Sequence, residues 1–184
     1  MTHIVGVAGS LRRASLNLGL LRAAEALMPE GATLEVRTLH DIPLYNGDDE
    51  AATGMPPAVT ALKEALASAD GVLLATPEYN NGIPGVFKNA IDWASRPPAD
   101  TERVFAGRPF AVIGASPGGF GTILAQDAWL PVLRTLGTQP WFGGRLLVSH
   151  AGKLFDAGGN LIDEDSRERL RAFLAGFVSH VRGR

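Results

Sequence analysis

The chain has 184 residues, a formal net charge of −2 and no cysteine. This length is typical of one domain, so we expect residues 1–184 to form a single domain. The small net charge gives no electrostatic reason to expect nucleic acid or a membrane as the main partner. The lack of cysteine excludes a disulfide framework, a thiolate metal site and a cysteine nucleophile. Redox chemistry would therefore have to use a bound cofactor.

Targeting and metal-binding signals are also missing from the sequence. The first strand begins almost at once, without a basic segment followed by a long apolar one, and no apolar run approaches the ~20 residues that span a bilayer. We therefore expect a cytoplasmic protein. The acidic run at residues 48–50 is interpreted as a solvated loop, and no metal site is expected.

Short apolar runs alternate with helical patterns along the chain. We expect strands at residues 3–8, 33–39, 71–75, 109–115 and 145–149, with the second at an edge of the sheet because its polarity alternates. Helices are expected after a cap at Ser15, after Pro57, over residues 86–93, over about 123–136, and over a last segment from about 170 to 181. Pro131 should kink or split the fourth helix. Residues 40–56 and 153–163 read as loops, the latter with room for a small hairpin.

This order of elements predicts an α/β protein with a doubly wound parallel sheet and helices on both faces. Five strands favour the flavodoxin-like strand order over the six-stranded dinucleotide-binding fold. In such sheets ligands bind outside the carboxyl ends of the strands. Three loops that follow strands are therefore candidates for a binding site.

The first loop, residues 9–17, carries groups that suit a phosphate. Ser10 and Ser15 offer hydroxyls, Asn17 an amide and Arg12 a guanidinium, and a helix begins there. A polar turn with a serine cap explains the same residues about as well. The loop lacks the Gly-Lys-Ser/Thr of a Walker motif and the three spaced glycines of a dinucleotide fingerprint.

The second loop, residues 76–85, is stiffened by Pro77 and Pro84, which lowers the entropy lost when a ligand binds. Its backbone could face the edge of a planar heteroaromatic ring, with Tyr79 stacking or lining the pocket. Glu78 could serve only to cap or brace the loop. A rigid connector without a ligand remains the alternative.

The third loop, residues 116–122, allows a serine hydrolase as a rival reading. Residues 114–118 fit G-x-S-x-G around Ser116, with Asp127 and His150 following in hydrolase order. The residue after that serine must donate its N–H to the oxyanion, and here it is Pro117, which has none. Losing one such donor costs about 100- to 1000-fold in rate. A surface against the edge of a flat ring fits better.

These motifs resemble the NADPH-dependent FMN reductase family, on the branch with chromate, quinone and azo-dye reductases. The resemblance rests on G-S-L-R-R-A-S-L-N at 9–17, T-P-E-Y-N at 76–80 with the following helix, and G-A-S-P-G-G-F-G at 114–121. It implies that FMN lies along the strand ends. It also implies that the phosphate is held by Ser10, Arg12, Ser15, Leu16 and Asn17. The isoalloxazine would lie against Pro77, Glu78, Tyr79 and Asn80, largely through backbone, with Ser116 and Gly118 on its other side.

The resemblance further implies an enzyme in which NADPH or NADH passes hydride to flavin N5. The electrons then go to a quinone, chromate, an azo compound or free flavin. The flavin carries the chemistry, so no catalytic residue is assigned. A homodimer or homotetramer is implied as well. Asn81-Gly82 departs from the larger residue that many members carry, which leaves substrate preference open. The alternative is a flavodoxin-type electron-transfer module without nicotinamide turnover.

Overall fold

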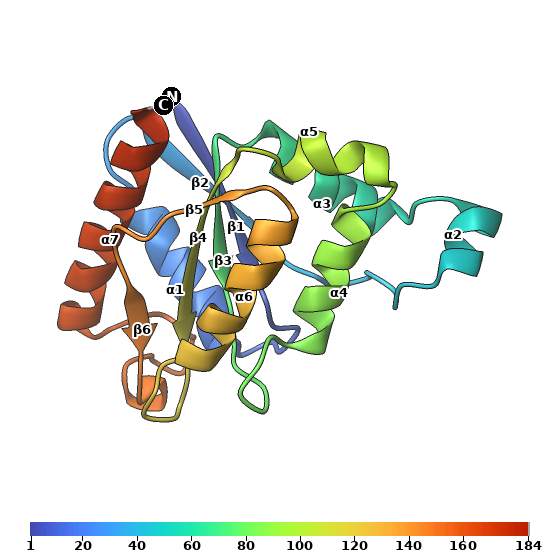
Figure 1. Ribbon diagram of the computed structural model, residues 1–184. Helices are drawn as coiled ribbons and strands as arrows, with labels where there is room; N and C mark the ends of the chain where they lie inside the picture. The colour runs from blue at the N-terminus through green and yellow to red at the C-terminus, as the bar shows by residue number, and fades with distance from the viewer. Residues whose placement is uncertain (184) are drawn as a thin grey trace.

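The computed structural model describes residues 1–183 of the chain. Its strands form one sheet in which every pairing is parallel (Figure 1). The order β2-β1-β3-β4-β5 is the flavodoxin-like order, so the predicted fold class is confirmed. The strands are β1 (Thr2–Ala8), β2 (Ala32–Arg37), β3 (Gly71–Ala75), β4 (Pro109–Ala115), β5 (Gln139–Pro140) and β6 (Leu146–Val148).

The fifth position of the sheet is shared by two short strands. β5 pairs with the start of β4, where Pro109 lies beside Gln139, and β6 pairs with its end, where Ala115 lies beside Val148. The single strand expected at residues 145–149 is therefore the second half of an interrupted edge strand. The intervening loop carries Trp141 and Phe142 and returns the chain to the sheet.

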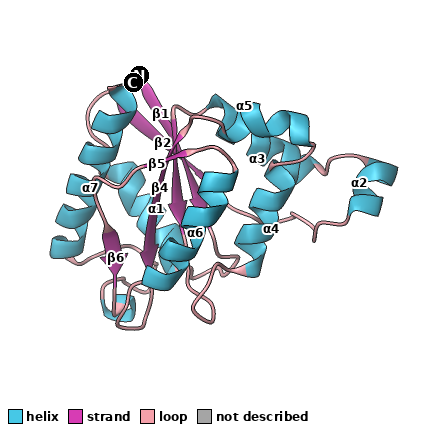
Figure 2. Cartoon of the chain, in the orientation of Figure 1, coloured by secondary structure: helices cyan, strands magenta, loops and turns pink. Residues whose placement is uncertain are grey.

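Helices cover both faces of this sheet (Figure 2). One face is covered by α1 (Leu16–Ala26) and α7 (Glu164–Arg182), whose apolar residues share a core with the sheet. A second core on the other face is completed by α3 (Pro57–Ser68), α4 (Gly85–Ala94), α5 (Thr101–Phe105) and α6 (Ile123–Thr135). Two short 3-10 helices are also present, at Pro98–Asp100 and at Ala151–Lys153.

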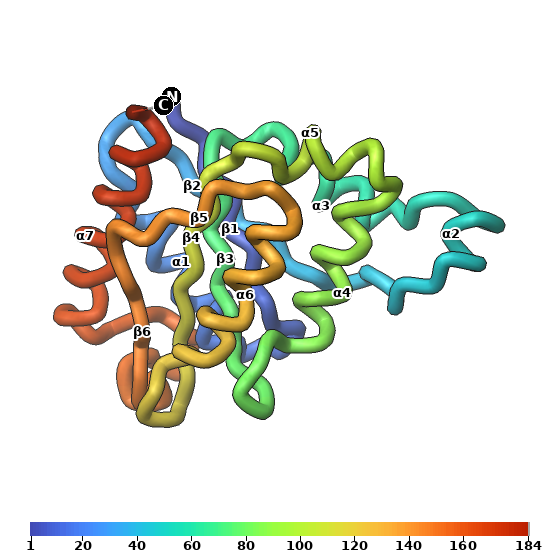
Figure 3. Tube along the Cα trace, in the orientation of Figure 1, coloured from blue at the N-terminus to red at the C-terminus, as the bar shows by residue number. Residues whose placement is uncertain are grey.

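The segment between β2 and α3 forms an arm that leaves the body beside α4 and returns to α3 (Figure 3). It contains a short helix, α2 (Gly47–Thr53), none of whose residues is buried. The arm is attached at its base, where Asn89 and Trp93 both donate to the carbonyl of Pro43 at 2.8 Å. Sequence periodicity predicted only a loop here, because α2 has no apolar face.

Of the two outcomes expected at Pro131, a kink or a split of the helix, the structure excludes the split. This residue lies inside α6, which runs from Ile123 to Thr135 as one element and is not split. Trp129 and Leu133 on the same helix are fully buried. Their burial against the sheet stabilises the helical backbone on both sides of the missing N–H.

The start of β1 and the end of α7 lie side by side where the strands have their amino ends (Figure 1). There the Arg182 side chain donates to the Thr2 hydroxyl at 3.0 Å. The opposite edge, with the carboxyl ends of the strands, carries the three candidate loops. Among the described residues, no helix has the length and apolar character needed to cross a membrane.

Candidate functional site

The three loops leave from three neighbouring strands in the middle of the sheet. Their last residues are Ala8 of β1, Ala75 of β3 and Ala115 of β4. The sheet hydrogen bonding continues into the loops: Gly9 N–H donates to the Ala75 carbonyl and Thr76 N–H to the Ile113 carbonyl, each at 2.9 Å. The chain turns to opposite sides after β1 and β3, which is the switch point where open α/β sheets bind ligands.

Most of the residues predicted from the sequence line one pocket at this point. Asn80 and Gly118 are the two predicted residues that do not line it, and Ala115 and Pro117 are additional lining residues. The predicted residues that it brings together are Ser10, Arg12, Ser15, Leu16, Asn17, Pro77, Glu78, Tyr79 and Ser116. Segments separated by about a hundred positions in the chain thus meet in one site.

The start of α1 presents donors toward an anion. Ser15 is the N-cap, and its hydroxyl accepts from the Leu18 N–H at 3.2 Å. The N–H groups of Leu16 and Asn17 are in the first turn, where no carbonyl of the helix is available to them. The Arg12 side chain makes no hydrogen bond or ion pair with any residue in 1–183. Two backbone donors, the helix dipole and an unpaired cation therefore converge here.

The Asn17 side chain makes contacts inside the protein that the sequence did not predict. It is buried, its amide nitrogen donates to the Ala115 carbonyl at 3.0 Å, and its oxygen accepts from the Ala115 N–H at 2.9 Å. The side chain thus joins α1 to the end of β4. Its backbone N–H lies in the first turn of α1, where the helix offers it no carbonyl.

Tyr79 connects the first loop to the second. Its hydroxyl lies 3.5 Å from the Ser10 hydroxyl, while the Ser10 oxygen also accepts from the Arg12 N–H at 3.3 Å. The Tyr79 side chain is 46% exposed, which is high for a large aromatic residue. An exposed aromatic ring on the wall of a polar pocket is suited to contact with a flat ligand.

Glu78 acts as a cap for α6. One carboxylate oxygen accepts from the N–H groups of Leu124 and Ala125, at 2.8 and 3.0 Å. A negative charge at this end of a helix is also favoured by the helix dipole. The second loop is thereby fixed to the helix that follows the third loop. This oxygen of Glu78 is committed to the cap, while the backbone of Glu78 stays available to a ligand.

The tip of the second loop is a two-residue hairpin turn. Tyr79 and Gly82 exchange two backbone hydrogen bonds at 3.1 and 3.2 Å, and Asn80 and Asn81 have φ of 50° and 61°. This is the geometry of a type I′ turn, which asparagine tolerates better than most residues. It places Asn80 and Asn81 at the tip beyond the pocket wall and explains why Asn80 does not line the pocket.

The third loop forms the opposite wall and lacks the geometry of a serine hydrolase. The Ser116 hydroxyl accepts from the Gly118 N–H at 3.1 Å, and Gly118 in turn accepts from the backbone N–H of His150 at 2.9 Å. Among the described residues, no hydrogen bond joins the Ser116 hydroxyl to the His150 ring or that ring to Asp127. Together with Pro117, this geometry gives no support to a nucleophilic Ser116.

These groups fit FMN. The phosphate suits the anion position made by Arg12 and the N–H groups of Leu16 and Asn17. The flat isoalloxazine suits the space between the stiff second loop, with its exposed Tyr79, and the third loop. The pocket thus offers the two kinds of surface that a flavin mononucleotide requires, a polar and cationic one for the phosphate and a flat one for the ring.

Fold and site define a flavodoxin-like protein with a flavin-type pocket at its central strand ends. Residues 2–153 match the model of the family "NADPH-dependent FMN reductase". An NAD(P)H-dependent FMN reductase of Pseudomonas aeruginosa is 44% identical over 179 residues, covering 97% of this chain and 95% of the relative. The chain belongs to the NADPH-dependent FMN reductase family, whose members are oxidoreductases that use FMN with NAD(P)H.

Further relatives agree with this assignment. A 2-hydroxy-1,4-benzoquinone reductase of Burkholderia is 38% identical, covering 98% of this chain and 97% of the relative. Among solved structures, the flavoenzyme NAD(P)H:(acceptor) oxidoreductase FerB of Paracoccus denitrificans superposes with a TM-score of 0.85 and 37% identity, over 100% of this chain and 98% of that one. An FMN-dependent NADH-azoreductase of Bacillus anthracis, in complex with FMN, shares the fold, with a TM-score of 0.59.

Proposed function

We propose that this protein is an FMN-dependent NAD(P)H oxidoreductase of the cytoplasm that reduces quinones. The observation that carries the proposal is the single pocket in which the first, second and third loops meet. The likeness to the Burkholderia benzoquinone reductase and to several other quinone reductases favours a quinone as acceptor over chromate, azo compounds or free flavin. Residues 1–184 act as one FMN-binding domain, and the chain works as a homodimer or homotetramer.

In this proposal each part of the pocket has its own task. The Arg12 guanidinium and the N–H groups of Leu16 and Asn17 bind the phosphate. The backbone of Pro77, Glu78 and Tyr79 orients the isoalloxazine, and Ser116 lines its other side. FMN, when bound there, would supply the redox chemistry between NAD(P)H and the quinone. The chain's residues position the ligands, and no side chain is assigned as acid, base or nucleophile.

The decisive experiment is anaerobic titration of the FMN-loaded protein with NADPH or NADH. The visible flavin band should bleach and return on addition of a benzoquinone. A yellow protein that neither nucleotide bleaches would refute the proposal and favour an electron-transfer module. A colourless protein that does not bind FMN but cleaves an activated ester would instead favour the serine hydrolase.

The phosphate position is tested separately with Arg12→Ala. Losing a charge-assisted contact of about 1.5–3 kcal/mol should weaken FMN binding by roughly 10- to 100-fold. Arg13→Ala is the matched control, because Arg13 is an exposed neighbour that does not line the pocket. Equal FMN affinities in the two variants, measured by fluorescence titration, would place the phosphate elsewhere.

A further inference from the structure

Charged side chains are few around the pocket where the three loops meet. Of the residues within 1–183 that line it, Arg12 is the one cation and Glu78 the one carboxylate. Arg12 belongs to the first loop, which suits the phosphate, whereas Glu78 belongs to the second loop, which suits the flat ring. A negative charge of the protein therefore lies beside the proposed position of the ring.

The Glu78 carboxylate is held in place by the start of α6. One of its oxygens accepts from the N–H groups of Leu124 and Ala125, at 2.8 and 3.0 Å. The helix has no cap of its own, because the side chain of its N-cap Thr122 makes no capping hydrogen bond and its first turn has no acidic residue. Glu78 supplies both the cap and the negative charge from another loop.

The carboxylate keeps a part that faces away from this cap. Its second oxygen has no hydrogen-bond partner within residues 1–183, and the residue as a whole is half-buried. No ion pair with a Lys, Arg or His of the described chain neutralises it. The charge of Glu78 is therefore offset only by the partial positive charge at the start of α6.

Two helices begin at this edge of the sheet, and their first turns differ. The N–H groups of Leu16 and Asn17 at the start of α1 have no partner in the helix, and no acidic residue lies in that turn. At the start of α6 the corresponding N–H groups are occupied by Glu78. An anion is therefore favoured at α1 and disfavoured at α6, where a negative charge is already present.

Reduction changes the charge of a flavin ring. A hydride carries two electrons and one proton, so the ring that accepts it gains one negative charge, while NAD(P)H becomes NAD(P)⁺. A carboxylate beside the ring raises the energy of this negative form relative to the neutral oxidised form. Charge close to the ring nitrogens is one of the means by which a protein tunes a flavin.

We propose that the Glu78 carboxylate, held against the start of α6, lowers the redox potential of FMN bound in the pocket. The inference rests on the proposed function, in which the ring lies between the second and third loops. It gives the Glu78 charge a role besides capping α6. A lower potential makes the reduced ring a stronger donor, which favours passage of its two electrons to a quinone.

The test replaces Glu78 by Gln, which removes the charge and keeps an oxygen that can accept from Leu124 and Ala125. The FMN-loaded protein is equilibrated without oxygen against a reference dye of known potential, at low salt and mildly alkaline pH. At a fixed potential the ratio of reduced to oxidised FMN should rise about tenfold, which for a two-electron couple is about 30 mV. The shift should shrink at high salt, because water reaches the half-buried carboxylate.

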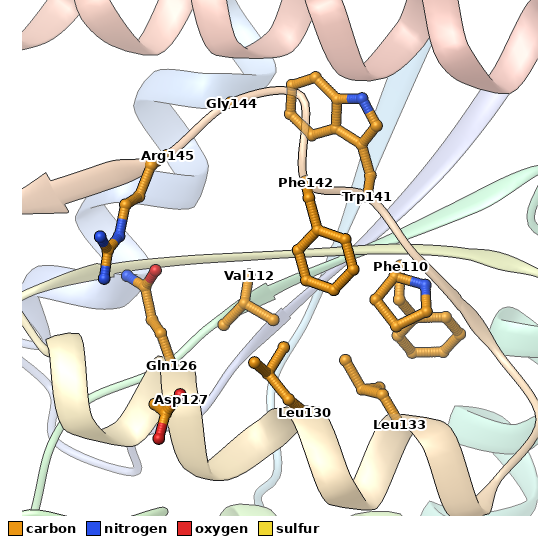
Figure 4. A pocket seen from close by; sticks show the side chains of 11 residues that line it. Phe110, Val112, Gln126, Asp127, Leu130, Leu133, Trp141, Phe142, Gly144 and Arg145 are labelled. Atoms are coloured by element: carbon orange, nitrogen blue, oxygen red, sulfur yellow. The ribbon is translucent and has the colours of Figure 1, made fainter.

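Two further variants separate the charge from the fold. Glu78→Asp keeps a carboxylate on the same loop, so its potential should stay close to that of the wild type. Asp127→Asn removes a carboxylate from α6 itself, but Asp127 lines a different hollow beside Leu130 and Trp141 (Figure 4). This exposed charge is screened by water, so the potential should not change.

Affinities for the two redox forms of FMN give a second readout, because the potential shift equals the change in their ratio. A damaged pocket weakens both forms alike and leaves the potential unmoved. Glu78→Gln should instead favour reduced over oxidised FMN about tenfold more than the wild type does. An unchanged potential in Glu78→Gln, or the same shift in Glu78→Asp or Asp127→Asn, would overturn the inference.

The outcomes also distinguish this inference from the proposed function. A protein that binds no FMN would overturn both together. Failure of NAD(P)H to reduce the bound FMN would refute the proposed enzyme alone, because the dye equilibrium uses no nucleotide and still decides the role of Glu78. Normal reduction by NAD(P)H with equal potentials in the wild type and Glu78→Gln would overturn the role of Glu78 alone.

Discussion

At the residue scale, the Asn17 side chain joins two of the segments that form the pocket. Its amide makes a pair of hydrogen bonds with the backbone of Ala115, between α1 and the end of β4. The first loop ends at this link and the third loop begins there. This contact could not be predicted from the sequence, because Ala115 is 98 positions away.

Replacing Asn17 by Ala should destabilise the folded protein even without FMN. The N–H and carbonyl of Ala115 would both lose their partner in a buried position, which costs about 2–5 kcal/mol in total. Chemical denaturation of the flavin-free protein measures the change. Ser15→Ala is the graded comparison, because loss of one N-cap costs about 1 kcal/mol. Similar stability of the two variants would contradict the bridging role.

At the scale of elements, Glu78 couples the second loop to α6. The Glu78→Ala change removes two backbone contacts of a carboxylate at a helix N-terminus. We expect a loss of about 2 kcal/mol in unfolding free energy and a weaker affinity for FMN, because the ring-binding backbone loses its support. Denaturation and flavin titration measure the two effects. Glu25→Ala, on the exposed side of α1 and without an ion pair among residues 1–183, should change neither.

A second element-scale prediction concerns acid. Asp163 is the N-cap of α7, and its hydrogen bonds with Ser166 lower the pKa of its carboxyl. A carboxyl whose pKa is lower in the folded state stabilises that state above its ordinary pKa of about 3.9. That stabilisation is lost as the pH falls through the folded value. The melting temperature should therefore fall more steeply below about pH 4 in the wild type than in Asp163→Asn.

Asp100 contributes in the same direction, because the Lys63 ammonium 2.7 Å away lowers its pKa. In the double variant Asp100→Asn with Asp163→Asn, the melting temperature should fall less at low pH than in either single variant. Parallel melting curves for all variants between about pH 7 and about pH 3 would contradict this account.

The elements that could be predicted from the sequence are those with a regular apolar pattern. The buried strands and the amphipathic helices α1, α3 and α7 follow from periodicity and from caps such as Ser15. α2 could not be found in this way, because it buries nothing and is held by contacts of the arm's base with α4. β5 is two residues long, which is too short for any pattern to show.

At the scale of the whole molecule, topology explains why the candidate site was visible in the sequence. Three loops at the ends of three parallel strands must lie at one edge of the sheet, and the order β1-β3-β4 makes them neighbours. The sequence left open which side chains of the pocket make contacts within the protein and which remain without a partner there. Glu78, Asn17 and Ser15 use their side chains on the protein, whereas the Arg12 side chain has no partner within residues 1–183. Which side chains have a partner depends on distances between segments far apart in the chain.

This difference between Arg12 and Asn17 predicts two kinds of pocket variant in a melting experiment with and without FMN. A ligand that binds only the folded state stabilises it by an amount that grows with its excess over Kd, about 4 kcal/mol at a thousandfold excess. Arg12→Ala should melt like the wild type when flavin-free and lose part of the increase that FMN gives. Asn17→Ala should start from a lower melting temperature. If Arg12→Ala also lowered the flavin-free value, Arg12 would have a structural partner in the folded protein, and the free cation at the phosphate position would have to be abandoned.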